Sequence, residues 1–163
     1  MMKFHRDGTL PTNGEIFVFG SNLAGIHGAG AAKVAATKFG AKYGVGIGMT
    51  GQSWAIPTKN LNIETMPLDD IVVYVNKFVK QTQTVDLTEF FVTRVGCGLA
   101  GYTDAQIAPM FRGAKNCSFA EEWKEFLMKP DLISDRANNH ITIPLQRRVM
   151  PTIFATMTTN NRK

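Results

Sequence analysis

Two glycine-rich segments carry the clearest chemical signal in this sequence of 163 residues. Of its 15 glycines, nine lie between Gly20 and Gly51, and three more lie between Gly96 and Gly101. Glycine lets the main chain turn sharply or come close to a ligand, because it has no Cβ. Successive backbone N–H groups at the start of a helix can then cradle a phosphate. The sequence therefore predicts two loops that hold an anion together, and an ordinary strand–helix turn is the alternative for either loop alone.

Three side chains in these loops could take part in catalysis. His27 is the strongest candidate, since imidazole can accept or donate a proton near neutral pH, although it could instead only hydrogen-bond the ligand or the backbone. Asn22 could position water or substrate, or it could form an Asx turn. Nearby N–H donors are expected to lower the pKa of Cys97. No base adjoins this cysteine in the sequence, so we favour a small residue that fits the turn.

Other polar residues near the loops have weaker claims. Tyr102 offers an aromatic face to a ligand or packs in a partly buried position. Asp104 could be a base, but its place in the first turn of a predicted helix favours support of that helix. His5 and His140 stand alone, without the spacing of metal ligands. We therefore expect no metal and no cofactor.

The strands and helices around the loops must position these residues. Residues 15–19 form a short apolar run between glycines, which predicts a buried strand, and residues 90–95 predict another. A helix is predicted over residues 31–39 after the first loop. A capping box of Thr103 and Gln106 starts a helix after the second loop. Alternating strands and helices predict an α/β domain with a mixed or parallel sheet, whose ligands bind beyond the carboxyl ends of the strands.

Two further elements complete the predicted sheet and its cover. Residues 53–56 read as a strand that ends at Pro57, and Gln52 and Lys59 are expected to face the pocket. The apolar residues of 68–79 recur with helical spacing after Pro67, and acidic residues in the first turn and lysines in the last suit the helix dipole. We expect a long amphipathic helix here.

The C-terminal part of the chain is less regular. Ser118 and Glu121 form a second capping-box pattern, which predicts a helix. Residues 141–143 resemble a short strand. We expect one domain over residues 1–129 and a basic extension over residues 130–163, which carries three of the five net positive charges of the chain.

Composition excludes several classes of partner. The net charge of +5 suggests an anionic partner, but a broad nucleic-acid surface would need clustered cations with interleaved aromatics. Two cysteines are too few for a disulfide scaffold. No signal peptide and no apolar stretch of about 20 residues is visible. We expect a cytoplasmic protein without a membrane or nucleic-acid partner.

The order of these motifs resembles the ADP-ribose-binding macrodomains. In that family an asparagine closes a strand, and a triple-glycine run, often preceded by histidine, leads into a helix. Here Asn22 and residues 27–32 stand in those places, with Ala29 replacing the middle glycine. Residues 95–102 are similar to the second phosphate loop of the family. The resemblance covers about residues 15–125 and is closest to phage and bacterial macrodomain-like proteins.

This resemblance implies a three-layer α/β/α fold with a mixed central sheet and a site for ADP-ribose or a related nucleotide. It assigns Asn22 to the hydroxyls of the distal ribose, and Tyr102 to a ribose or the distal end. Macrodomains often carry an aspartate near the first strand for the adenine amine, but Asp7 lies too far upstream to be assigned this role. The expected ligand-binding residues are Gly20, Ser21, Asn22, Gly28, Ala29, Gly30, Ala31, Gly96, Cys97, Gly98, Leu99, Ala100, Gly101 and Tyr102.

Two kinds of activity are compatible with such a site. An enzyme would hydrolyse an ADP-ribosyl linkage or ADP-ribose 1″-phosphate, with Asn22 and His27 as catalytic residues that guide water to C1″. No acidic general base is evident, so a non-catalytic reader or sink of an ADP-ribose-type nucleotide signal is the alternative. An ADP-ribosylated macromolecule is a further expected partner, both for the enzyme and for the non-catalytic reader. A Rossmann-like nucleotide sensor is a third hypothesis, which a doubly wound strand order would favour.

Overall fold

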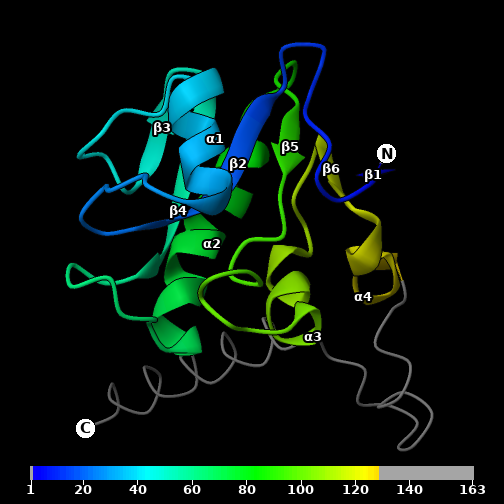
Figure 1. Cartoon of the computed structure of the whole chain (residues 1–163). Coiled ribbons are helices and arrows are strands. Elements are labelled where there is room, and N and C mark those ends of the chain that lie inside the picture. Colours follow the sequence, from blue (N-terminus) through cyan, green and yellow to red (C-terminus); the bar gives the residue numbers. More distant parts are fainter. Residues whose placement is uncertain (1, 129–163) are drawn as a thin grey trace, which may run out of the picture. The chain divides into compact units, whose positions relative to one another are not determined.

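Six strands form one mixed sheet in the order β1-β6-β5-β2-β4-β3, in a computed structural model that describes residues 2–128. Every neighbouring pair is parallel except β3 and β4, which are antiparallel. Figure 1 shows this order from β3 on the left to β1 on the right. The strands are β1 (Lys3–His5), β2 (Ile16–Asn22), β3 (Gly48–Thr50), β4 (Ser53–Lys59), β5 (Phe90–Val92) and β6 (Cys117–Ala120). The predicted α/β class with a mixed sheet is confirmed.

Helices of very different length connect these strands. They are α1 (Gly30–Lys38), α2 (Leu68–Thr82), α3 (Asp104–Ile107) and α4 (Lys124–Met128), with short 3-10 turns η1 (Ala108–Phe111) and η2 (Glu121–Trp123). The apolar stripe of α2 buries Ile71, Val75 and Phe78, as its helical spacing predicts. The predicted capping box is present at the start of α3, where Thr103 and Gln106 bond each other's backbone N–H groups.

The two faces of the sheet are buried by different helices. Successive residues of a strand point to opposite faces. Phe17, Phe19 and Phe91 accordingly join a small core with α1, in which Ala32 and Ala35 are buried. Val18 and Val92 join the larger core with α2, η1, η2 and α4. The buried residues of α1, Ala32 and Ala35, are small, so this helix can lie close to β2.

The connections leave two adjacent strands in opposite directions. The chain passes from β2 through α1 and β3 to β4, on one side of β2. From β5, on the other side of β2, it passes through α3 and η1 to β6. In open α/β sheets such a reversal creates a crevice beyond the carboxyl ends of the two strands. The sheet is not of the classical doubly wound type, in which the first strand is central, because β1 lies at an edge.

The segment around Ser118 differs from the prediction. It forms strand β6 between β1 and β5, and helix α4 begins only at Lys124. Phe119 is fully buried, with its ring near those of Phe111 and Trp123. The Ser118 hydroxyl lies 2.7 Å from His5 Nδ1 and does not cap a helix. Pairing on both edges and burial of Phe119 therefore outweigh the local capping pattern.

Strand β4 also continues past its predicted end at Pro57 and ends at Lys59. Pro57 pairs with Ser21 of β2, whereas the pairing of β3 with β4 stops at Ala55. Proline is tolerated in a strand where no neighbour needs its missing N–H group. The three added residues, 57–59, place Lys59 at the sheet edge that bears the crevice.

Two predictions lie outside the described residues: the strand over 141–143 and the basic extension over residues 130–163. Within residues 2–128, no helix is long and apolar enough to cross a bilayer.

Candidate functional site

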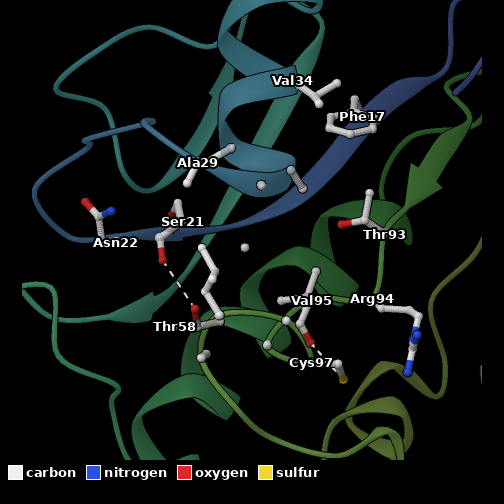
Figure 2. A pocket seen from close by; sticks show the side chains of 18 of the residues that line it. Phe17, Ser21, Asn22, Ala29, Val34, Thr58, Thr93, Arg94, Val95 and Cys97 are labelled. Atoms are coloured by element: carbon white, nitrogen blue, oxygen red, sulfur yellow. Dashed lines mark hydrogen bonds between the residues drawn. The ribbon is translucent and has the colours of Figure 1, made fainter. Parts of the chain in front are cut away.

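A cleft of about 660 Å³ opens at the carboxyl ends of the parallel strands and extends along the sheet beside α1. Its walls come from both glycine-rich loops, from the start of α1, and from the segments that follow β1, β4 and β5. Figure 2 shows the first loop and α1 on one side, and the second loop on the other. A concave site of this size is typical for a small organic ligand.

Most of the residues expected to bind a ligand do line this cleft. They are Gly20, Ser21, Asn22, Gly28, Ala29, Gly30, Ala31, Gly96, Cys97, Gly98, Leu99 and Ala100. The residues that line it do not include Gly101, Tyr102, His27 or Gln52. The Tyr102 hydroxyl donates instead to the carbonyl of Met66 at 2.6 Å, which ties the second loop to the segment before α2.

The first loop presents backbone N–H groups at the start of α1. Ala29 occupies the N-cap position without a side-chain hydrogen bond, and the first turn contains no acidic residue. The first helical bond runs from the N–H of Lys33 to the carbonyl of Ala29 at 3.2 Å. Within residues 2–128, the N–H groups of Gly30, Ala31 and Ala32 find no acceptor. Three donors thus border the cleft at the positive end of a helix dipole.

The second loop has a comparable run of donors. Its turn is closed by hydrogen bonds from the Gly101 N–H to the Gly98 carbonyl at 3.0 Å, and from the Tyr102 N–H to the Gly96 carbonyl at 2.9 Å. The N–H groups of the residues between, 98–100, have no acceptor in the described part of the chain. Such consecutive N–H groups form a concavity suited to an anion. Donors from both loops therefore border one cleft.

The glycines in and around the two loops differ in whether the fold requires a residue without a Cβ. A Cβ on Gly25 would lie 2.3 Å from the Gly44 carbonyl carbon, and one on Gly46 would lie 2.0 Å from the Asn22 carbonyl oxygen. These glycines allow neighbouring loops to pack. In contrast, a Cβ on Gly28 or Gly98 would meet no atom within 4 Å, and neither residue has a left-handed backbone. Both line the cleft, so the fold itself does not require glycine there.

Asn22 holds the first loop in shape. Its side-chain Nδ2 donates to the Ile26 carbonyl at 2.8 Å, and its Oδ1 accepts from the Ile26 N–H at 2.9 Å. The residue is largely buried at the end of β2. This is the local turn-forming role that was one of its two expected roles. One N–H and one oxygen lone pair remain for a ligand.

His27 lies under the first loop and not in the cleft. It is 3% exposed, and its Nε2 donates to the Lys42 carbonyl at 3.1 Å. Its ring packs edge-on against Phe19 and Tyr43. The other nitrogen, Nδ1, is buried without a partner among residues 2–128. This geometry anchors the loop to the segment before β3 and gives the imidazole no access to a ligand in the cleft.

An ion-pair network lies at the end of the cleft where β1 and β5 end. The sequence did not reveal it. Arg94, directly after β5, binds Asp104 through Nε–Oδ1 and Nη2–Oδ2 distances of 2.9 and 2.7 Å. Its Nη1 lies 3.2 Å from Oδ2 of Asp7, a residue that also lines the cleft. The hydrogen bond with Asp104 raises the pKa of Arg94. Asp7 follows β1, which the sequence did not identify as a strand, so its place in the cleft was missed.

Asp104 is the centre of this network and is not available as a base. Burial would raise its pKa, but hydrogen bonds from Arg94 and Trp123 outweigh burial and hold the pKa below its usual range. The indole Nε1 of Trp123 donates to Asp104 Oδ1 at 2.7 Å. The carboxylate at the start of α3 therefore joins Arg94, which follows β5, to η2, the element that carries Trp123.

We expect Asp104→Ala to lower the free energy of unfolding by about 2 kcal/mol or more, because it leaves a buried indole N–H and a guanidinium without their acceptor. Asp7→Ala is the control, since Asp7 is more exposed and its loss should cost less than about 1 kcal/mol. Urea unfolding at pH 7 measures both. Equal effects would contradict the central position of Asp104. Because the Asp104 pKa is lowered on folding, its stabilising effect is complete at neutral pH and declines as the pH falls through that pKa.

Cys97 differs from its prediction. Burial raises its pKa to about 12, and the negative charge of Asp104 adds to this effect. Its Sγ donates to the Val95 carbonyl at 3.5 Å, as Figure 2 shows. The expected lowering by nearby N–H donors is wrong, because burial and the carboxylate favour the neutral thiol.

We expect the thiol of Cys97 to react with a disulfide reagent at pH 7.5 at least about a hundredfold more slowly than a free cysteine, because little thiolate is present. A Cys117→Ser background isolates it from the only other cysteine, and unfolding in urea should restore a normal rate. Rapid reaction of the native variant would show an activated Cys97.

The end of the cleft near Asp7 has an aromatic floor. The imidazole of His5 stacks on Phe91 with ring centroids 3.8 Å apart and an interplanar angle of 14°. Phe17 and Val34 line the same part of the cleft (Figure 2). Burial lowers the pKa of His5 below its ordinary value, although the carboxylate of Asp7 opposes the shift. A neutral, flat surface beside a carboxylate can accept a planar ring that bears a hydrogen-bond donor.

No family model, curated protein sequence or solved structure matches this chain. Residues 2–128 contain no group of three or more His, Cys, Asp or Glu side chains that could hold a metal ion.

Proposed function

We propose that this chain is a three-layer, macrodomain-like α/β/α domain that binds ADP-ribose or a closely related nucleoside diphosphate. The observation that carries the proposal is the pair of unpaired N–H runs, at 30–32 and 98–100, which border one cleft. A diphosphate between the loops would satisfy donors from both sides. Gly28 and Gly98 leave room for it, since no atom of residues 2–128 occupies the space that a Cβ would need.

The two ends of the cleft give the ligand a direction. The stacked rings of His5 and Phe91 suit adenine, and the free oxygen of Asp7 suits its amine, the role that macrodomains give to an aspartate near the first strand. Lys59 lines the cleft and forms no ion pair within residues 2–128, so its ammonium group can meet the diphosphate. The opposite end then receives the distal ribose near Asn22.

Binding without turnover is the activity that this geometry supports best. His27 is buried away from the cleft, and Asp104 is held as an ion-paired carboxylate. The amide of Asn22 is engaged with Ile26. We therefore propose a reader or sink of an ADP-ribose-type nucleotide rather than a hydrolase.

Isothermal titration calorimetry with ADP-ribose, ADP, AMP and inorganic pyrophosphate tests the proposal. We expect saturable binding of ADP-ribose and ADP, and weaker binding of AMP, which lacks the second phosphate. ADP-ribose 1″-phosphate and an ADP-ribosylated peptide should bind without release of phosphate or ADP-ribose. Turnover of either compound would establish a hydrolase, and His27→Ala would then show whether its imidazole is used.

A further inference from the structure

One end of the cleft has an apolar rim made by three loops. Ile26 in the first loop, Ile63 in the turn after β4 and Leu99 in the second loop all line the cleft. Their exposed fractions are 44%, 40% and 70%, respectively. Aliphatic side chains exposed to water around a cleft have an energetic cost that a bound apolar group would remove. We call these three residues the apolar rim.

Ile63 has a backbone conformation that its residue type disfavours. Its φ angle is +64°, in the left-handed region where a β-branched residue is a genuine outlier. The one other non-glycine residue of this kind in the described part is Asn116, a type that tolerates the conformation. At position 63 an asparagine or glycine would satisfy the turn at lower cost. The fold alone therefore gives no reason for isoleucine.

A rigid frame maintains this strained turn. The side-chain Oδ1 of Asn60 accepts from the N–H groups of Asn62 at 2.8 Å and Glu64 at 3.0 Å. The N–H of Asn60 donates to the Glu64 carbonyl at 2.8 Å. A strained backbone that several hydrogen bonds hold in place is typical of binding sites. There it fixes a side chain in position before the ligand arrives.

Hydrogen bonds also connect the three loops of the rim. The Thr65 hydroxyl donates to the Ala100 carbonyl at 3.1 Å, and the Leu23 N–H donates to the Lys59 carbonyl at 2.9 Å. Leu99 reaches across to α1, since its Cδ1 lies 3.8 Å from the position of a Cβ on Gly30. The rim is thus built beside the N–H groups that border the cleft.

We infer that the preferred ligand is a dinucleotide, in which the ribose beyond the diphosphate carries a second planar ring that packs against the apolar rim. This inference rests on the proposed function. A ligand that ended in a free ribose would need hydrogen-bonding partners, but Ile26, Ile63 and Leu99 offer none through their side chains. Part of the Asn22 amide is already used by Ile26. The flat face of a ring, in contrast, can bury aliphatic surface.

Calorimetry with NAD⁺, ADP-ribose and ADP tests the inference on the full chain and on Ile63→Asn. The wild-type protein should bind NAD⁺ about tenfold more tightly than ADP-ribose, as burial of part of one ring predicts. Ile63→Asn should remove this preference and leave the affinity for ADP within about twofold. The same variant should melt roughly 3 °C higher, because asparagine relieves the strained backbone.

Leu99→Ser and Leu87→Ser form a matched pair. Leu87 is 95% exposed and lies before β5, at the end of the strand opposite the cleft. Leu99→Ser should weaken NAD⁺ binding, whereas Leu87→Ser should not change it. If ADP-ribose binds as tightly as NAD⁺ to the wild-type protein, the inference is overturned and the proposed function stands. If NAD⁺, ADP-ribose and ADP all fail to bind, the proposed function is itself overturned.

Discussion

Gly98→Val is expected to weaken the binding of ADP-ribose at least about a hundredfold, because the side chain would displace a diphosphate from several charge-assisted hydrogen bonds. Gly98 lines the cleft and begins the run of unpaired N–H groups in the second loop. Its backbone is not left-handed, and a Cβ there meets no atom within 4 Å in the described part of the chain. The substitution therefore fills ligand space without straining the fold.

The melting temperature of Gly98→Val should stay within about 2 °C of the wild-type value, since surface substitutions away from packed atoms have small effects. Gly98→Ala should bind with intermediate affinity, and Gly28→Val should reproduce the loss from the opposite loop. Calorimetry measures the affinity, and thermal unfolding measures the melting temperature. Unchanged affinity in Gly98→Val would show that the ligand does not pass this loop, and a large loss of stability would show that Gly98 is structural.

Gly46→Ala should have the largest effect on stability, with a loss of at least about 3 kcal/mol in the free energy of unfolding. The new Cβ would lie 2.0 Å from the carbonyl oxygen of Asn22, which is backbone and cannot rotate away. Either the end of β2 or the segment before β3 must move. Because Asn22 shapes the first loop, the affinity for ADP-ribose should fall as well.

Gly44→Ala is the matched control for this steric effect. Gly44 has a φ angle of +90°, but a Cβ there would meet nothing within 4 Å. We expect a loss of only about 1 kcal/mol, from backbone conformation alone. Urea unfolding of the two variants separates the cost of the steric clash from the cost of the backbone conformation. Similar losses in both would mean that close packing of the loops does not stabilise the fold.

The glycine clusters show which features of the candidate site could be predicted from the sequence alone. Their position after two apolar runs correctly predicted loops at one edge of an α/β sheet, because that signal is local. The sequence could not separate Gly46, which packs against Asn22, from Gly98, which faces open space. That distinction depends on neighbours from other parts of the chain. Only part of the glycine enrichment therefore bears on the proposed ligand site.

Helix α2 and strand β6 show the same difference between local patterns, which the sequence reveals, and distant contacts, which it does not. The apolar stripe of α2 is strong and local, so its pattern predicted the helix. The capping pattern at Ser118 was weaker than pairing with β1 and β5, which are distant in sequence. The missed strand β1 also concealed Asp7, whose ion pair with Arg94 spans 87 positions. For His27, the glycine pattern correctly predicted a loop, but a local pattern could not show that the imidazole lies beneath that loop.

Calorimetric titration of the full chain with ADP-ribose, on the wild-type protein and on Gly98→Val, is the decisive measurement for a diphosphate site in the cleft. A diphosphate site between the two loops requires saturable, one-to-one binding to the wild-type protein and no measurable binding to a Gly98→Val variant that melts normally. The absence of binding heat and of any thermal shift with ADP-ribose and ADP at millimolar concentration would contradict it.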